Sequence, residues 1–114
     1  MDDNKTVLAA ASVYKAKYYI NPDFASLPPA VKNDIKALCI GTAQRLHCVF
    51  MVGFYDDGSV FFEAQAQEDD FVYDEIGAPP EVKRLTAEHK ELIAALQLYL
   101  KVFAGVGGEE WAGS

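Results

Sequence analysis

The strongest structural signal in this chain is a β-hairpin signature near its middle. Residues 48–55 are mostly β-branched or aromatic, residues 56–58 are Asp-Asp-Gly, and residues 59–67 alternate between apolar and polar side chains. An Asp-Gly pair favours the left-handed backbone conformations that match the twist of two paired strands. The sequence therefore predicts two antiparallel strands joined by a tight turn, and the fold must contain a sheet.

A two-residue loop at Asp57 and Gly58 also predicts which side chains share a face of the hairpin. The cross-strand pairs on one face are all apolar: Tyr55 with Val60, Gly53 with Phe62, Met51 with Ala64, and Val49 with Ala66. We expect helices to cover that face. The opposite face carries Phe50, Phe54 and Phe61 beside polar residues, so it is either solvated or bound to a partner. These three phenylalanines are the predicted interaction surface.

Helical patterns are expected on both sides of the hairpin. Residues 6–19 are rich in alanine, with apolar side chains at three- and four-residue steps, and predict a first helix, although residues 13–20 also fit a strand. Leu27-Pro28-Pro29 begins a second helix that continues to about residue 46, because proline is tolerated in a first helical turn. After Gly77-Ala78-Pro79-Pro80, an apolar stripe over residues 82–103 predicts one long last helix.

Residues 71–76, Phe-Val-Tyr-Asp-Glu-Ile, fit a short third strand. Together these elements predict an α+β domain, an antiparallel hairpin or three-stranded meander packed against two or three helices in the order α-α-β-β-(β)-α. A chain of 114 residues that is 51% hydrophobic and 24% charged is globular rather than disordered, and it has room for one core. We expect a single domain over residues 1–104 and a flexible Gly-rich tail over residues 105–114.

The charge distribution limits the partners and the location of the protein. The formal net charge is −7, and all of it comes from residues 58–114, which carry four basic and eleven acidic side chains. Binding to nucleic acid or to anionic membranes requires a basic patch, so both are excluded as predicted partners. The acidic start of the chain is unlike a secretory leader, and the longest apolar run is too short to span a bilayer. We expect a cytoplasmic protein whose two cysteines are reduced.

Carboxylates concentrated in residues 63–75 form the first candidate site. They are Glu63, Glu68, Asp69, Asp70, Asp74 and Glu75. Hard cations such as Ca²⁺ and Mg²⁺ prefer clusters of oxygen ligands, which makes a divalent cation site chemically possible. The spacing of a calcium-binding loop is absent, however, so a solvated turn is the favoured interpretation. We predict no metal and no cofactor.

The histidines and cysteines give little support to catalysis. Neighbouring residues in a strand point to opposite faces, so His47 is not placed to activate Cys48 as a nucleophile. Whether Cys39 approaches a histidine in space is left open by the sequence. His89 lies on the apolar stripe of the last helix, where a hydrogen-bonded histidine at the edge of the core is the favoured interpretation. No catalytic residue is predicted, and the balance favours a protein that is not an enzyme.

Several short segments resemble one known family. They are residues 14–21 (Tyr-Lys-Ala-Lys-Tyr-Tyr-Ile-Asn), Phe24 with Leu27-Pro28, Asp57-Gly58-Ser59, and residues 73–77 (Tyr-Asp-Glu-Ile-Gly). The chain resembles a family of short uncharacterised proteins, a domain of unknown function from Gram-positive bacterial anaerobes. The resemblance covers residues 5–104. It implies no activity, cofactor or site residue.

Two functions remain open at this point. The favoured one is a small cytosolic protein-interaction or regulatory domain that binds an unknown protein or itself, as a homodimer, through Phe50, Phe54 and Phe61. The alternative is a small-ligand-binding protein or enzyme with a pocket between the last helix and the hairpin. The pocket candidates are Glu63, His89, Cys39 and Tyr73, because a carboxylate such as Glu63 on a mostly apolar strand can act as a general acid.

Overall fold

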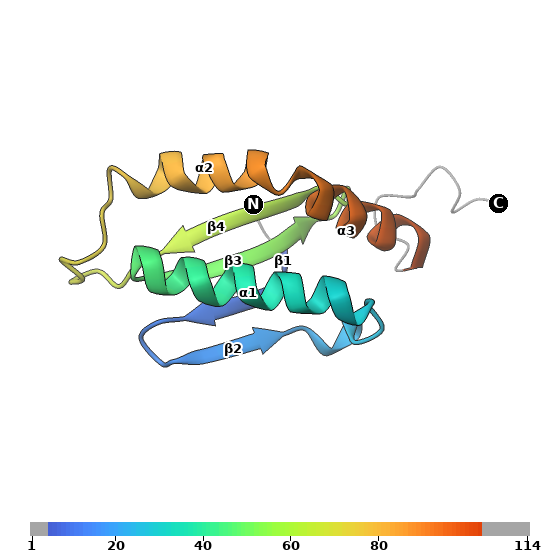
Figure 1. The fold of residues 1–114 in the computed structure, drawn as a ribbon, viewed down its shortest axis with the longest axis horizontal. Coiled ribbons are helices and arrows are strands. Elements are labelled where there is room, and N and C mark those ends of the chain that lie inside the picture. Colours follow the sequence, from blue (N-terminus) through green and yellow to red (C-terminus); the bar gives the residue numbers. More distant parts are fainter. Residues whose placement is uncertain (1–4, 104–114) are drawn as a thin grey trace.

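A computed structural model describes residues 5–103 and shows an α+β fold with one antiparallel sheet (Figure 1). The strands are β1 (Lys5–Ser12), β2 (Lys17–Ile20), β3 (Val49–Tyr55) and β4 (Val60–Gln65), in the spatial order β2-β1-β3-β4. The helices are α1 (Pro29–Leu46), α2 (Ala78–Glu88) and α3 (Lys90–Phe103), with a short 3₁₀ turn at Pro22–Phe24. The predicted class is confirmed, but the predicted element order is wrong, because two strands come first. The predicted tail, residues 105–114, lies outside the described residues.

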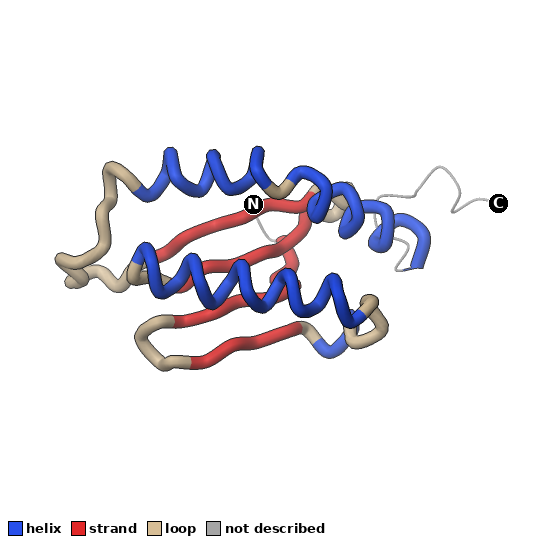
Figure 2. The backbone as a smooth tube through the Cα atoms, in the orientation of Figure 1, coloured by secondary structure: helices blue, strands red, loops and turns tan. Residues whose placement is uncertain are grey.

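All three helices pack against the same face of the sheet (Figures 1 and 2). Phe50, Val52 and Phe54 of β3 point into this layer and are buried, as is Phe62 of β4. They meet buried side chains from all three helices in one core, namely Ile35, Leu38, Cys39, Leu85, Leu96 and Leu100. No helix in the described part of the chain covers the other face of the sheet, which we call the uncovered face.

The hairpin of β3 and β4 is confirmed, but its predicted register is wrong by one residue. The Tyr55 amide donates to the Ser59 carbonyl and the Gly58 amide donates to the Tyr55 carbonyl, which closes a three-residue loop with Gly58 at φ 87°. Phe54 therefore pairs with Val60, and Phe50 with Ala64. Because strand side chains alternate between faces, the shift turns β3 over, and Phe50 and Phe54 enter the core.

The helix predicted over residues 6–19 is wrong, since these residues form β1 and the start of β2. β1 is a central strand that pairs with β2 on one side and with β3 on the other. Leu8, Ala9 and Ala11 of β1 are buried, and α1 packs directly on this strand. Small alanine side chains suit a strand beneath a closely packed helix, so tertiary contacts override their preference for helix. The alternative strand prediction over residues 13–20 is correct for Lys17–Ile20.

The remaining predictions for helices and strands are confirmed in part. α1 begins at Pro29 as expected and ends at His47, which adopts a left-handed conformation at φ 60°. α2 begins at Ala78 as expected, but the predicted long helix divides at His89 into α2 and α3. The predicted third strand is wrong, because residues 71–76 belong to the loop between β4 and α2. None of the helices described here is both long and apolar enough to cross a bilayer.

Candidate functional site

The loop between β4 and α2, residues 66–77, displays large apolar side chains to solvent, and we call it the acidic loop. The exposed fractions of Phe71, Ile76 and Val72 are 96%, 86% and 70%. The same loop carries five carboxylates and no basic residue. Single exposed apolar residues are ordinary on protein surfaces, but three on one loop, each at least 70% exposed, make this loop a candidate interaction surface.

Asp70 anchors the acidic loop to two distant segments of the chain. Its Oδ2 atom accepts a hydrogen bond from the Tyr14 hydroxyl at 2.5 Å and lies 2.7 Å from Nδ1 of His47. Tyr14 belongs to the turn between β1 and β2, and His47 follows α1. The Tyr14 hydroxyl also accepts a hydrogen bond from the Gln67 amide at 3.1 Å. The base of the loop is thus bonded to the body of the domain.

The electrostatics of this anchor favour a charged Asp70. Hydrogen bonds from Tyr14, His47 and the Val72 amide lower the pKa of Asp70 to about 2, the Tyr14 bond being the largest cause, although burial acts in the opposite direction. The Asp70 side chain is only 5% exposed. Burial and the neighbouring Asp70 raise the pKa of Tyr14, which keeps the phenol protonated as a donor. The anchor is therefore an ionised Asp70 carboxylate that accepts hydrogen bonds from the neutral Tyr14 phenol, the His47 ring N–H and the Val72 amide.

Two aspartates also fix the backbone of the acidic loop. Oδ1 of Asp70 accepts hydrogen bonds from the Val72 and Tyr73 amides, and Oδ1 of Asp74 accepts from the amides of Ile76 and Gly77. Such side-chain bonds to the following backbone are an alternative to strand pairing, which explains why residues 71–76 do not form the predicted strand. The two turns hold the intervening apolar side chains in the solvent.

The left-handed conformation of His47 places its ring beside Tyr14. α1 ends there, with the Cys48 amide donating to the Ala43 carbonyl, and β3 starts at the next residue but one. The His47 and Tyr14 rings meet edge to face, with their centroids 5.5 Å apart. Positive φ is uncommon outside glycine, and histidine is one of the residues that tolerate it. The reversal of the backbone at His47 thus places the end of α1 in contact with the β1–β2 turn through Tyr14 and with the acidic loop through Asp70.

The chemistry available around this anchor is limited. His47 and Asp70 form a pair like the oriented base of a hydrolase, but the neighbouring thiol of Cys48 is buried, and burial raises its pKa to about 11. Burial raises the pKa of Cys39 to about 12. Both thiols are therefore protonated at neutral pH and are poor nucleophiles. Within residues 5–103, no three His, Cys, Asp or Glu side chains are grouped so that they could hold a metal ion.

The predicted interaction surface does not form. Phe50 and Phe54 are buried against the helices, and Phe61 lies on the uncovered face. The cause is that the predicted hairpin register differs from the observed one by one residue. The prediction therefore places the side chains of β3 on the wrong faces of the sheet, whereas it places those of β4 correctly. The prediction is therefore wrong for Phe50 and Phe54, which do not share a surface with Phe61.

The predicted pocket residues lie in four different places. Glu63 is on the uncovered face, 3.4 Å from Nζ of Lys5, whereas Cys39 is a buried residue of α1 in the core. His89 lies between α2 and α3, with Nδ1 3.0 Å from the Leu85 carbonyl oxygen. Tyr73 is in the acidic loop. The structure does not bring these four side chains together into one site.

The side chain of Lys5 covers part of the uncovered face. The members of this face include Lys5, Val7, Ala10, Met51, Tyr55, Phe61 and Glu63. The ammonium group of Lys5 lies 5.1 Å from the Phe61 ring centroid and 5.8 Å from that of Tyr55, and it also reaches Glu63. Long side chains that cover apolar surface in this way reduce its need for a partner. The acidic loop has no comparable cover over Phe71, so it is the better candidate surface.

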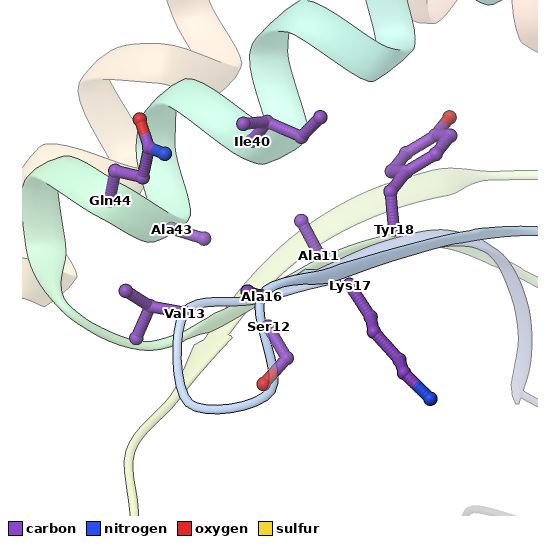
Figure 3. Close-up of a pocket in the computed structure, with 9 residues that line it drawn as sticks. All are labelled: Ala11, Ser12, Val13, Ala16, Lys17, Tyr18, Ile40, Ala43 and Gln44. Atoms are coloured by element: carbon purple, nitrogen blue, oxygen red, sulfur yellow. The ribbon is translucent and has the colours of Figure 1, made fainter.

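A cavity of about 230 Å³ lies between the β1–β2 hairpin and the C-terminal half of α1 (Figure 3). Its walls are mainly apolar, with Ala11, Val13, Ala16 and Tyr18 from the hairpin and Ile40 and Ala43 from the helix. The side chain of Lys17 points away from the cavity, and Gln44 lies at its rim (Figure 3). Small alanine side chains on both sides create the space.

The sequence did not reveal the Tyr14–Asp70–His47 anchor. Tyr14 falls within the helix predicted over residues 6–19, and Asp70 is one of six similar carboxylates. One signal was present, since aspartates that precede a turn by two or three residues are typical of loops fixed by side-chain bonds. Nothing in the sequence indicated that the first turn and the acidic loop are neighbours.

The chain is similar to one known family. The model of a family of unknown function (DUF6145) matches residues 5–109. No curated protein and no solved structure matches the chain. The resemblance to a domain of unknown function is thus confirmed, and its bacterial source stays a prediction.

Proposed function

This chain belongs to DUF6145, a family of unknown function, and we propose that it is a small cytosolic protein-interaction domain whose binding element is the acidic loop. The single observation that carries the proposal is the exposure of Phe71, Ile76 and Val72 on a loop whose backbone is fixed. Burying one such side chain contributes about 1.5–3 kcal/mol. A partner that covers Phe71 would gain this free energy.

The hydrogen bonds of the acidic loop support binding because they order it in advance. Association normally costs the conformational entropy of the groups that become fixed. Here the anchor at Asp70 and the second turn at Asp74 already hold the backbone between them. A preorganised loop that presents an aromatic side chain has the properties of a binding hot spot.

The charge of the acidic loop indicates the kind of partner. Five carboxylates without a basic residue disfavour anionic partners and favour a protein surface with lysines or arginines around an apolar pocket. A cytosolic location is part of the proposal and agrees with two buried cysteines that form no disulfide. The alternative, a small-ligand-binding protein, is favoured by one observation, the cavity beneath α1.

Site-specific photo-crosslinking in cells of the source organism tests the proposal. p-Benzoylphenylalanine would replace Phe71 in the acidic loop, Tyr19 on the uncovered face, or Lys83 on the exposed side of α2. We expect a defined crosslinked protein from position 71 only. A product from position 19 only would move the interface to the uncovered face. Equal labelling at all three positions, or none at 71, would show that the acidic loop is not a binding element.

A further inference from the structure

We infer that the acidic loop binds a second copy of this chain, and that Phe71 of each copy occupies the cavity between the β1–β2 hairpin and α1 of the other. This inference rests on the proposed function and names its partner. Phe71 does not enter the cavity of its own chain, since its side chain is 96% exposed. The loop and the cavity are therefore complementary features that one chain leaves unpaired.

The cavity has the size and the lining that a phenyl ring requires. Its volume is about 230 Å³, and apolar cavities of about 150 Å³ already bind benzene. Ala16 and Ala43 lie on opposite walls, with Ile40 above the opening between them (Figure 3). No charged group points into this space in Figure 3. An aromatic ring would exchange water for apolar contacts on both of its sides.

The segments that form the cavity carry the charge opposite to that of the acidic loop. Residues 12–20 and 35–46 contain three lysines and one arginine, and no carboxylate. The arginine, Arg45, is already paired with Glu81 at 3.0 Å. The lysines are Lys15, Lys17 and Lys36, all exposed. The Lys17 side chain points away from the cavity, but Lys15 lies in the β1–β2 turn next to it. A loop with Glu68 and Asp69 beside Phe71 would bring carboxylates toward this positively charged segment, which favours this docking over a contact between two acidic loops.

The position of both features makes a closed dimer possible. The Tyr14 hydroxyl bonds to Asp70 and Gln67, so the β1–β2 turn lies next to the acidic loop. Both occupy one end of the elongated molecule, at the left of Figure 1. A two-fold axis near this end would therefore place the Phe71 ring of each copy in the cavity of the other. Assembly would stop at the dimer, because both loops and both cavities would then be occupied.

Sedimentation velocity and native mass spectrometry on the purified full chain test this arrangement. Phe71→Ser removes the ring, and Gln44→Trp fills the cavity from an exposed helical position. Leu98→Ser and Lys83→Trp are matched controls, because they make similar changes on α3 and α2, away from the proposed contact. We expect a wild-type dimer, a dimer Kd raised about tenfold or more by the first two variants, and no change from the controls.

Mixing the two dissociated variants gives a stricter test. In a mixed pair, Phe71 of the Gln44→Trp chain still meets the open cavity of the Phe71→Ser chain, so one contact survives. We expect the two variants to form a heterodimer whose Kd is lower than the homodimer Kd of either variant. Circular dichroism melts of both variants should match wild type, which separates loss of binding from loss of folding.

Three results would overturn the inference. A wild-type chain that remains monomeric up to about millimolar concentration excludes a second copy, while crosslinking from position 71 to another protein would leave the proposed function intact. A dimer that survives both substitutions uses a different surface. If Phe71→Ser abolishes the dimer and Gln44→Trp leaves it unchanged, the Phe71 ring binds outside this cavity.

Discussion

Asp70 is the residue on which the acidic loop depends. Its carboxylate connects Tyr14 and His47 and also accepts the Val72 and Tyr73 amides. An amide in its place would present one acceptor oxygen and one NH₂ group, which cannot accept these bonds. The role of Asp70 is also the hardest part of the site to predict, because it depends on Tyr14, which is distant in sequence and lies in a segment that the sequence pattern predicts as helix.

Acid should destabilise the protein through Asp70 and Glu81. The pKa of each is about 2 in the folded protein, mainly because of the Tyr14 hydrogen bond to Asp70 and the Arg84 hydrogen bond to Glu81. In the unfolded chain these pKa values are about 3.9 and 4.3. Both are lowered by folding, so their stabilising effect is complete above about pH 5 and is lost as the pH falls toward 2.

Urea unfolding at several pH values between 6 and 2 measures this loss. We expect Asp70→Asn to be less stable than wild type at pH 6 and to lose less stability between pH 5 and 2. Asp69→Asn, at the exposed neighbouring position, is the control and should follow the wild-type curve. Parallel curves for Asp70→Asn and wild type would show that the anchor does not depend on the charge of Asp70.

At the scale of elements, the β3–β4 hairpin, α1 and the start of α2 could be predicted, because each carries a local signal such as Asp-Gly or a proline in the first turn. β1 could not be predicted, since its alanines are in a strand only because β2, β3 and α1 surround them. The faces of β3 could not be predicted either. One additional loop residue, Asp56, decides whether Phe50 lies in the core or in solvent.

Two glycines in different elements should respond oppositely to alanine. A Cβ at Gly53 of β3 would lie 2.6 Å from both the Phe61 ring and the Thr6 carbonyl oxygen, whereas a Cβ at Gly41 of α1 meets no atom within 4 Å. Gly53→Ala should destabilise the protein by about 1–3 kcal/mol through overpacking. Gly41→Ala should stabilise it by about 0.5–1 kcal/mol, because alanine favours the helix.

Chemical denaturation of both glycine variants at neutral pH provides the comparison. The Gly41 variant is a control for the effect of adding a methyl group to the unfolded chain. Equal midpoints for the two variants would contradict the close packing of Phe61 against β3.

At the scale of the whole molecule, charge is divided between two neighbouring regions of one end. The acidic loop is negative, and the hairpin and α1 segments beside the cavity carry Lys15, Lys17 and Lys36. Exposed charges interact over about 10 Å at 0.1 M salt and over about 3 Å at 1 M. The proposed dimer should therefore weaken as salt is added, mainly through slower association.

Dimer dissociation constants at 0.05, 0.15 and 0.5 M NaCl check this dependence. We expect a progressive rise in Kd for wild type and a smaller one for Lys15→Glu, which removes one favourable charge from the β1–β2 turn. Lys83→Glu on α2 serves as its control and should retain the wild-type salt dependence. A Kd that falls with salt would indicate an interface held by apolar contact alone.

The central place of β1 has a consequence for how the chain folds during synthesis. β1 is made first, but one of its two neighbours is β3, and residues as far apart as Lys5 and Tyr55 must pair. Contacts between such distant residues slow folding, because a long loop must close before they form. A nascent chain that has left the ribosome only as far as α1 has a hairpin and a helix with no completed sheet to hold them. We expect native structure to appear late in translation, once β3 has emerged to pair with β1 on one side and with β4 on the other.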